Sequence, residues 1–265
     1  MPAQLFDDQA DHFDNRAGLP TGLAHQVATA LSDLGKKHHC ERILEIGPGT
    51  GELGCELMQR FPRYIAMDLS LAMLKKFDQR VVSKGHLIQA DGRASWPLKD
   101  DAIDFVFGAR SLHHIPPAHV LSELDRLRKN RAGILVIGQK RRDPDSAMEK
   151  LRRKLHEFLI LEGFEAREKD RWGKRLTELI SEKHHVRIES VPIHRWLEKC
   201  VIEQALLQWT SKKGLAGLEL SASLQSKILQ DLRKWATEEL GDLTLERANE
   251  VEYRLKVFSI SEWVS

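Results

Sequence analysis

The sequence predicts a doubly wound α/β fold that is built on a mostly parallel sheet. Apolar runs such as 105–107 and 134–137 are typical of strands that a parallel sheet buries on both faces. Segments with helical periodicity alternate with these runs, which is the order of elements in a wound sheet. A turn containing Gly47, Gly49 and Gly51 follows the first apolar run and leads into a helix-periodic segment.

Two helices are expected before the first strand. Residues 5–16 carry three apolar side chains on one helical face, and Gly18 and Pro20 then break the pattern. A second helical stripe follows in Leu23, Val27, Leu31 and Leu34. The sequence therefore places an N-terminal helical region at residues 1–40.

The core is expected to alternate strands and helices. Strands are predicted near residues 42–46, 64–68, 86–89, 103–107 and 133–138. Helices are predicted near residues 51–61, 70–80 and 117–129. In a sheet of this kind, ligands bind at the carboxyl ends of the strands, so the polar motifs that follow the strands are the expected binding site.

The last part of the core is expected to be helical and then to return to the sheet. Residues 139–185 form a long, highly charged region whose apolar stripes predict helices packed on the core. Residues 186–191 and 251–257 alternate with period two, which is typical of strands at a less buried edge of a sheet. These two segments would be the sixth and seventh strands.

An insertion is expected between these two strands. Residues 193–249 are far too long for a hairpin. One helix is predicted from Leu197 through Leu206, and another from Leu224 through Trp235. We interpret the insertion as a helical cap over the substrate, with a dimerisation element as the alternative.

The glycine turn indicates a ligand site. Glycine has no Cβ, so the backbone can approach a ligand closely, and the start of the following helix supplies N–H donors. Residues 49–54 also match the G-x-G-x-x-G dinucleotide pattern, and Asp68 follows at the spacing of a ribose-binding acid. The glycine spacing alone leaves two ligand classes open.

Further segments separate the two classes. Glu45 precedes the first glycine by two residues, and residues 65–70, 89–92 and 105–115 follow in order. In that order and spacing they resemble the class I S-adenosylmethionine-dependent methyltransferases, in particular the broad group that acts on small molecules. The resemblance implies S-adenosylmethionine as cofactor and a seven-stranded, Rossmann-like methyltransferase fold whose last strand is antiparallel. Residues 41–192 and 250–265 would form this core. The resemblance also implies that the helices of residues 1–40 fold over the cofactor and contribute to a lid.

The resemblance assigns cofactor contacts to the ends of the first strands. The three glycines would approach the amino-acid and ribose parts, while Glu45 would orient the loop or receive the ammonium group. Asp68 would accept hydrogen bonds from both ribose hydroxyls. Its alternative is a helix N-cap, for which Ser70 is better placed. The other implied contacts are Leu69 and Met73 beside the adenine, Asp91 as acceptor from its amine, Gly92 next to Asp91, Arg16 at the methionine carboxylate, and Arg110 after the fourth strand.

The catalytic residues are less defined than the cofactor contacts. A sulfonium methyl is already activated, so the protein must chiefly hold the acceptor in line, exclude water and, for some acceptors, take a proton. His113 or His114 could be the general base, although packing behind the site is the favoured role. Expected substrate contacts in the insertion are His194, Trp196 and Trp209.

Composition argues against several other classes. The formal net charge is +2 with 30% charged residues, and acids interleave with the basic clusters, so nucleic-acid binding is not favoured. The three cysteines have no metal-ligand spacing. No apolar run could span a bilayer and the first residues lack a secretory signal, so the sequence predicts a soluble, cytoplasmic protein.

The leading hypothesis is therefore methyl transfer to oxygen, nitrogen or carbon of a small molecule. One alternative is an RNA-modifying methyltransferase that uses the basic 139–187 region. Another is a non-catalytic or regulatory S-adenosylmethionine-binding protein, and nicotinamide-dependent oxidoreduction is a distant fourth. The acceptor and the oligomeric state are left open.

Overall fold

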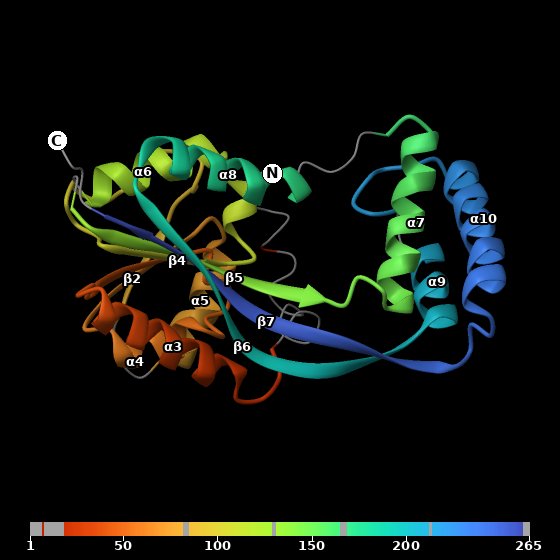
Figure 1. Ribbon diagram of the computed structural model, residues 1–265, viewed down its shortest axis with the longest axis horizontal. Helices are drawn as coiled ribbons and strands as arrows, with labels where there is room; N and C mark the ends of the chain where they lie inside the picture. The colour runs from red at the N-terminus through yellow and green to blue at the C-terminus, as the bar shows by residue number, and fades with distance from the viewer. Residues whose placement is uncertain are drawn as a thin grey trace. The chain divides into compact units, whose positions relative to one another are not determined.

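A seven-stranded sheet forms the centre of the fold (Figure 1). The computed structural model describes residue 7 and residues 19–81, 85–128, 131–164, 169–211 and 214–261. Apart from residue 7, the first expected helix lies outside these residues, and so does Arg16. The strand order is β3-β2-β1-β4-β5-β7-β6. The strand order reverses beside β1, as it does in a doubly wound sheet.

Five strands form the parallel part of the sheet. They are β3 (His86–Gln89), β2 (Arg63–Asp68), β1 (Arg42–Ile46), β4 (Phe105–Ala109) and β5 (Gly133–Arg142). Each neighbouring pair among these five strands is parallel. Their apolar composition matches their position, because every residue of β1 after the first is buried.

The two remaining strands are long and run against each other. They are β6 (Val186–Val201) and β7 (Glu246–Ile260). The Ser261 backbone N–H donates to the His185 carbonyl at 3.2 Å, and Lys199 forms an ion pair with Glu246 at 2.7 Å. The start of one strand therefore faces the end of the other, which makes the pair antiparallel. The predicted mixed, mostly parallel fold is confirmed.

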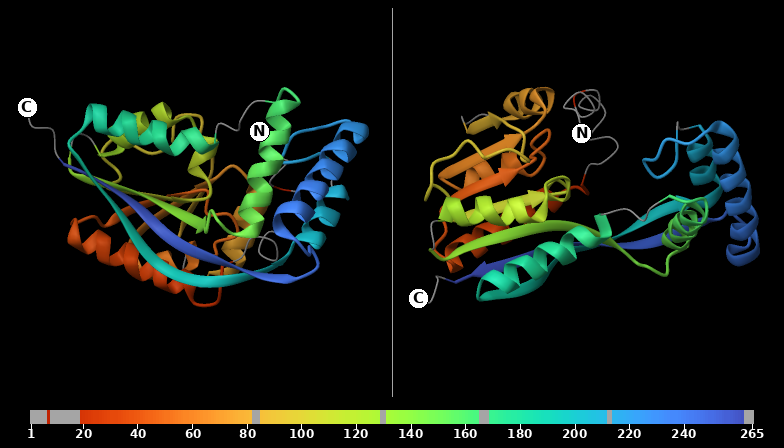
Figure 2. Two further views of the ribbon diagram at one scale, coloured as in Figure 1. Left: turned by 45° about the vertical axis from the view of Figure 1, so that its right-hand side comes forward. Right: turned by 90° about the horizontal axis from the view of Figure 1, so that it is seen from above.

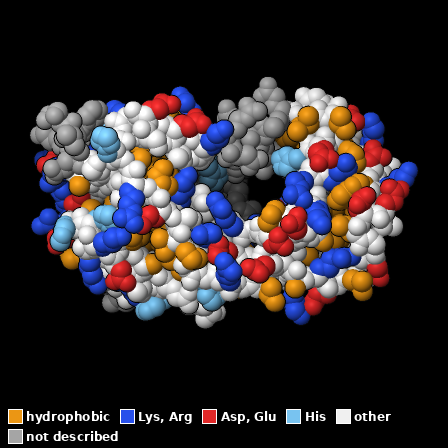
Figure 3. Space-filling view, in the orientation of Figure 1, with side chains coloured by type: hydrophobic (Ala, Val, Ile, Leu, Met, Phe, Trp, Pro, Cys, Tyr) orange, Lys and Arg blue, Asp and Glu red, His pale blue; other side chains and the backbone are white. Residues whose placement is uncertain are grey.

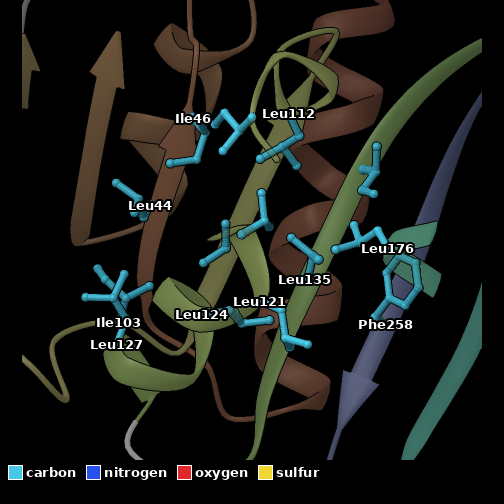
Figure 4. Close-up of a cluster of buried hydrophobic side chains, with 14 of the residues drawn as sticks. Leu44, Ile46, Ile103, Leu112, Leu121, Leu124, Leu127, Leu135, Leu176 and Phe258 are labelled. Carbon is cyan, nitrogen blue, oxygen red and sulfur yellow. The ribbon is translucent and has the colours of Figure 1, made fainter. Parts of the chain in front are cut away.

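Helices cover both faces of the parallel sheet (Figures 1 and 2). One face carries α3 (Leu23–Lys37), α4 (Gly54–Arg60) and α5 (Leu71–Arg80), and the other carries α6 (Pro117–Arg128) and α8 (Lys169–Lys183). A short 3-10 helix, η1 (Leu112–His114), follows β4. Figure 4 shows the apolar layer under α6 and α8, where Leu135 and Phe258 of the sheet lie near Leu121 and Leu176.

A second compact unit consists of residues 140–168 and 195–252. Its helices are α7 (Ala147–Leu161), α9 (Ile202–Thr210) and α10 (Ala222–Leu240). Leu151 and Leu155 of α7 pack in one apolar cluster with Ile202 and Leu232. We expected residues 139–185 to belong wholly to the core. Residues 140–168 instead pack with the insertion, because the apolar stripe of α7 meets α10.

The first predicted helix of the insertion is present as α9, but its predicted start at Leu197 is wrong. Residues 197–201 continue β6, and the helix begins at Ile202. Along this part of the strand, exposed side chains such as Leu197 alternate with partly buried ones such as Trp196. The period of two decides the structure, although Leu197 and Val201 also fit helical spacing. Within the described residues, no helix is both long enough and apolar enough to cross a membrane.

Candidate functional site

A cavity lies at the carboxyl ends of β1, β2, β3 and β4, all within the first compact unit. The sequence-predicted residues that line it are Glu45, Gly47, Gly49, Asp68, Leu69, Met73, Asp91, Gly92, Arg110 and His114. The fold therefore brings together side chains that are up to 69 positions apart in the chain. This is the place where a wound sheet binds ligands.

The glycine turn forms one wall of the cavity. Gly47, Gly49 and Gly51 have φ values of +66°, +60° and +83°. Residues that have a Cβ rarely adopt such backbone angles. A Cβ on Gly47 would collide with Ser111, and a Cβ on Gly51 would collide with Phe77. Gly51 packs against Phe77 and does not line the cavity, so its expected contact with a ligand stays a prediction.

Glu45 is a buried carboxyl group at the base of the cavity. Its side chain is 2% exposed, and the Tyr64 hydroxyl donates a hydrogen bond to Oε2. Burial raises the pKa of Glu45 to about 7, although the hydrogen bond from Tyr64 acts in the opposite direction. A cationic group in the cavity would favour the ionised form of this carboxyl.

Asp68 ends β2 with a carboxylate that is held by the backbone. The Gly49 N–H donates to Oδ2 at 3.0 Å and the Ser70 N–H donates to Oδ1 at 2.9 Å. Ser70 itself caps α5, since its hydroxyl accepts from the Met73 N–H at 3.1 Å. Burial raises the pKa of Asp68. Each carboxylate oxygen retains acceptor capacity for a ligand hydroxyl.

Asp91 is already paired with a neighbouring arginine that the sequence analysis did not single out. Arg93 donates through Nε to Oδ1 at 2.9 Å and through a terminal nitrogen to Oδ2 at 2.7 Å. The Arg93 backbone N–H also donates to Oδ1 at 2.9 Å. This pairing lowers the pKa of Asp91. An adenine amine would have to share Asp91 with Arg93, which also lines the cavity.

The segment after β4 closes the opposite wall. Arg110 has φ +62°, a strained value for a residue with a Cβ, and its guanidinium lies 3.5 Å from the Glu52 carboxylate. The Ser111 hydroxyl donates to the Ile46 carbonyl and thereby ties this segment to β1. His114 lines the cavity but His113 does not, although their rings lie 4.0 Å apart. The strained backbone of Arg110 therefore lies in the cavity wall.

The expected substrate residues do not line this cavity. His194 lies on β6 in the first unit. Trp196 donates to Glu198 at 3.3 Å and carries Lys140 5.4 Å from its ring centre. Trp209 packs against the apolar cluster of the second unit. Trp209 therefore has a packing function, and the substrate roles of the other two stay predictions.

The sequence analysis missed three polar residues in the cavity wall. Thr50, Glu52 and Arg93 each line the cavity. Each of them lies within two residues of a glycine of the binding motifs. That position was the signal available in the sequence. No group of His, Cys, Asp and Glu side chains in the described ranges is arranged to hold a metal ion.

Comparison with known proteins identifies the unit that contains the cavity. Residues 44–137 match the family described as a methyltransferase domain. The matched stretch runs from β1 into β5 and includes every residue of the cavity wall. Residues 44–137 form a methyltransferase domain. The predicted family is confirmed.

Curated relatives match the methyltransferase domain at low identity. A demethylmenaquinone methyltransferase from Roseiflexus castenholzii is 27% identical over 115 residues, which are 42% of this chain and 48% of that protein. The ubiquinone/menaquinone biosynthesis C-methyltransferase UbiE from Dinoroseobacter shibae is 26% identical over 147 residues, which are 50% of this chain and 56% of that protein. The chain spans about half the length of these two relatives.

Solved structures share the fold over most of the chain. The N-methyltransferase NodS from Bradyrhizobium japonicum, solved with S-adenosyl-L-homocysteine, has a TM-score of 0.53 at 14% identity and covers 98% of both chains. The YcgJ protein from Bacillus subtilis has a TM-score of 0.51 at 14% identity and covers 89% of this chain and 99% of its own. At these identities the likeness shows the methyltransferase fold.

Proposed function

We propose that the protein transfers a methyl group from S-adenosylmethionine to a small-molecule acceptor. The observation that carries the proposal is the Asp68 carboxylate, which two backbone N–H groups hold at the cavity wall, across the glycine turn from Glu45. A nucleoside with vicinal hydroxyls and an amino-acid tail is complementary to this pair of carboxyl groups. The methyltransferase domain supports the same cofactor.

The residues of the cavity fit the parts of S-adenosylmethionine. Asp68 would accept from the ribose hydroxyls, and the Glu45 carboxyl would receive the ammonium group. Leu69, Met73 and Ile115 supply apolar surface for the adenine. When bound, S-adenosylmethionine supplies an activated methyl group on a sulfonium. The turn formed by residues 47–51 would bring the backbone close to the cofactor without a side chain between them.

The segment after β4 would act on the acceptor. Arg110 and Ser111 would position it near the Glu45 end of the cavity, where the methionine part is expected. Positioning and exclusion of water can supply much of the rate enhancement. Where the acceptor loses a proton, His114 would accept it at an imidazole nitrogen, because it is the histidine that lines the cavity.

A small acceptor is favoured over a nucleic acid. The names of the two curated relatives point to quinone precursors as their acceptors. The basic residues of 139–187 lie among acids: Lys140 pairs with Glu198, and Arg175 pairs with Glu178 at 3.4 Å. We extend to this chain only a small-molecule acceptor methylated at oxygen, nitrogen or carbon.

Titration calorimetry tests the cofactor, and Asp68→Asn is the decisive variant. We expect micromolar binding of S-adenosylmethionine and S-adenosylhomocysteine, and no binding of NAD or NADP. The variant loses the charge and keeps an acceptor oxygen for only one of the two backbone N–H groups, so affinity should fall roughly ten- to a hundred-fold. Asp33→Asn, on the exposed side of α3 beside Lys36, is the matched control. Wild-type affinity in folded Asp68→Asn would refute the assigned ribose contact.

Methyl transfer is tested with labelled cofactor and a panel of small phenols, quinols, amines and carboxylates. Transfer to any of them, absent in the Asp68→Asn variant, supports the enzyme. Cofactor binding without transfer to any acceptor would favour the regulatory alternative. Saturable binding of a nicotinamide dinucleotide without binding of S-adenosylmethionine would overturn the proposal.

A further inference from the structure

The hydroxyl of Tyr253 is buried without a partner. The side chain is 1% exposed, and Oη makes no hydrogen bond with any described residue. Burying a hydroxyl without a partner costs free energy, so such groups in folded proteins call for an explanation. A ligand that completes the hydrogen bond is one such explanation.

The sheet register places this hydroxyl on the cavity side of the sheet. Glu45 of β1 aligns with Phe107 of β4, and two residues later Ala109 of β4 aligns with Gly138 of β5. Aligned residues share a face, and so do residues two apart in a strand. Glu45, Ala109 and Gly138 are therefore on one face. A Cβ added to Gly138 would meet Tyr253 Oη, which puts that hydroxyl on the same face.

The hydroxyl lies immediately behind the cavity wall. The same added Cβ on Gly138 would be 3.1 Å from Tyr253 Cζ and 3.2 Å from Ala109 Cβ. Ala109 lines the cavity, so Tyr253 Oη and the wall share the small space above Gly138. This space exists because position 138 has no side chain. It lies at the carboxyl end of β4, beside the middle of β5.

The charged residues that act on Tyr253 line the cavity. Burial raises the pKa of Tyr253 above its ordinary value, Arg110 lowers it, and Glu45 and Glu52 raise it further. All three charged residues line the cavity. The neutral phenol of Tyr253 can donate a hydrogen bond. The nearby guanidinium of Arg110 favours a negative charge on the ligand group that accepts this hydrogen bond.

We propose that Tyr253 is a substrate-binding residue whose hydroxyl donates a hydrogen bond to an oxygen of the methyl acceptor. The acceptor class is one with a phenolate, carboxylate or carbonyl oxygen. This inference rests on the proposed function, which assigns the ends of β1 and β2 to the cofactor and the start of the segment after β4 to the acceptor. Tyr253 is not itself among the residues that line the cavity, so the acceptor must displace the wall at Ala109 to reach Oη.

The test compares wild type with Tyr253→Phe, using 4-nitrophenolate as the probe. Each protein is first saturated with S-adenosylhomocysteine, which carries no transferable methyl. We expect Tyr253→Phe to melt at the same temperature as wild type or higher, because the lost hydroxyl had no protein partner. Cofactor-product affinity should be unchanged. Affinity for the probe should fall about five- to ten-fold, the value of one hydrogen bond.

Tyr64→Phe is the matched control, because Tyr64 is the only other tyrosine in the chain. The Tyr64 hydroxyl donates a hydrogen bond to Glu45, so this variant should weaken the binding of S-adenosylhomocysteine. The affinity of the saturated protein for the probe should stay unchanged. The inference is overturned if Tyr253→Phe binds the probe as well as wild type, if saturated wild type does not bind it, or if the variant melts several degrees lower. Loss of S-adenosylhomocysteine binding in wild type would instead refute the proposed function, and the inference would fall with it.

Discussion

Glu45 makes the stability of the protein depend on pH. Its folded-state pKa of about 7 lies above the ordinary value of 4.5, because burial disfavours the charged form. A carboxyl with a raised pKa stabilises the fold below its unfolded-state pKa, and this contribution is lost as pH rises through the folded-state value. The loss amounts to roughly 3 kcal/mol.

We therefore predict that the unliganded protein loses stability between about pH 4.5 and about pH 7, which are the two pKa values of Glu45. Glu45→Gln should remove this part of the dependence, because an amide does not titrate. Thermal melting of both proteins across that range measures it, with the exposed Glu41→Gln as control. If the stability of wild type and of Glu45→Gln changes with pH in the same way, Glu45 does not have the raised pKa.

His113 and His114 should differ in what they contribute. His114 lines the cavity, whereas His113 lies behind it with its ring 4.0 Å away. We predict that His114→Gln lowers turnover by about a hundred-fold, without changing cofactor affinity, and removes a limb of the pH–rate profile. His113→Gln should lower the melting temperature and leave turnover per folded molecule nearly unchanged. If both variants turn over as fast as wild type per folded molecule, neither histidine is the general base.

At the scale of single elements, β5 shows how a strand is shaped by a residue on its neighbour. Gly138 leaves the space that Tyr253 fills, and a Cβ there would collide with Oη. We predict that Gly138→Ala costs about 1–3 kcal/mol, as expected for an overpacked site. In the Tyr253→Phe background the cost should shrink, because the nearest ring atom is then 3.1 Å away.

A double-mutant cycle by chemical denaturation measures this coupling. Gly173→Ala is the control, because nothing lies within 4 Å of a Cβ added to that glycine of α8. It should be neutral or slightly stabilising, since alanine is the better helix former. Strictly additive costs for Gly138→Ala and Tyr253→Phe would mean that the two residues do not share this space.

The sequence predicted the elements better than their ends. Strands β1, β2 and β3 begin and end within one residue of the expected limits, since the binding motifs mark their ends. β6 was expected to end at residue 191 but continues to Val201. Its outer half alternates without a turn residue to end it, while leucine at helical spacing suggested a helix. Local patterns conflict there, and the tertiary pairing with β7 decides.

At the scale of the whole molecule, sequence reasoning found the residues that motifs mark and missed those that only the fold brings together. Most expected cofactor contacts line one cavity because each follows a strand of the same sheet edge. The proximity of Tyr253 to Gly138 was not predictable, because it depends on β7 lying beside β5. The packing of α7 with α10 was missed for the same reason.

Charge is a property of the whole molecule, and it separates a small acceptor from RNA. The net charge is only +2, and Figure 3 shows Lys and Arg side chains interspersed with Asp and Glu on the face that it draws. In the basic region of residues 139–187, lysines form ion pairs with acidic residues. Lys154 pairs with Glu157, and Lys183 pairs with Asp125. These acids cancel much of the field that would attract phosphates.

We predict negligible affinity for RNA at physiological salt. Any binding at low salt would come from counterion release and should therefore collapse as salt rises, with each phosphate contact contributing to the slope. A filter-binding titration at about 50 mM and about 200 mM salt measures the effect. Lys154→Glu and Lys183→Glu, both outside the cavity wall, should reduce the low-salt binding and leave cofactor affinity unchanged. Tight binding of one RNA that persists at the higher salt, with transfer of labelled methyl to it, would replace the small-molecule acceptor by RNA.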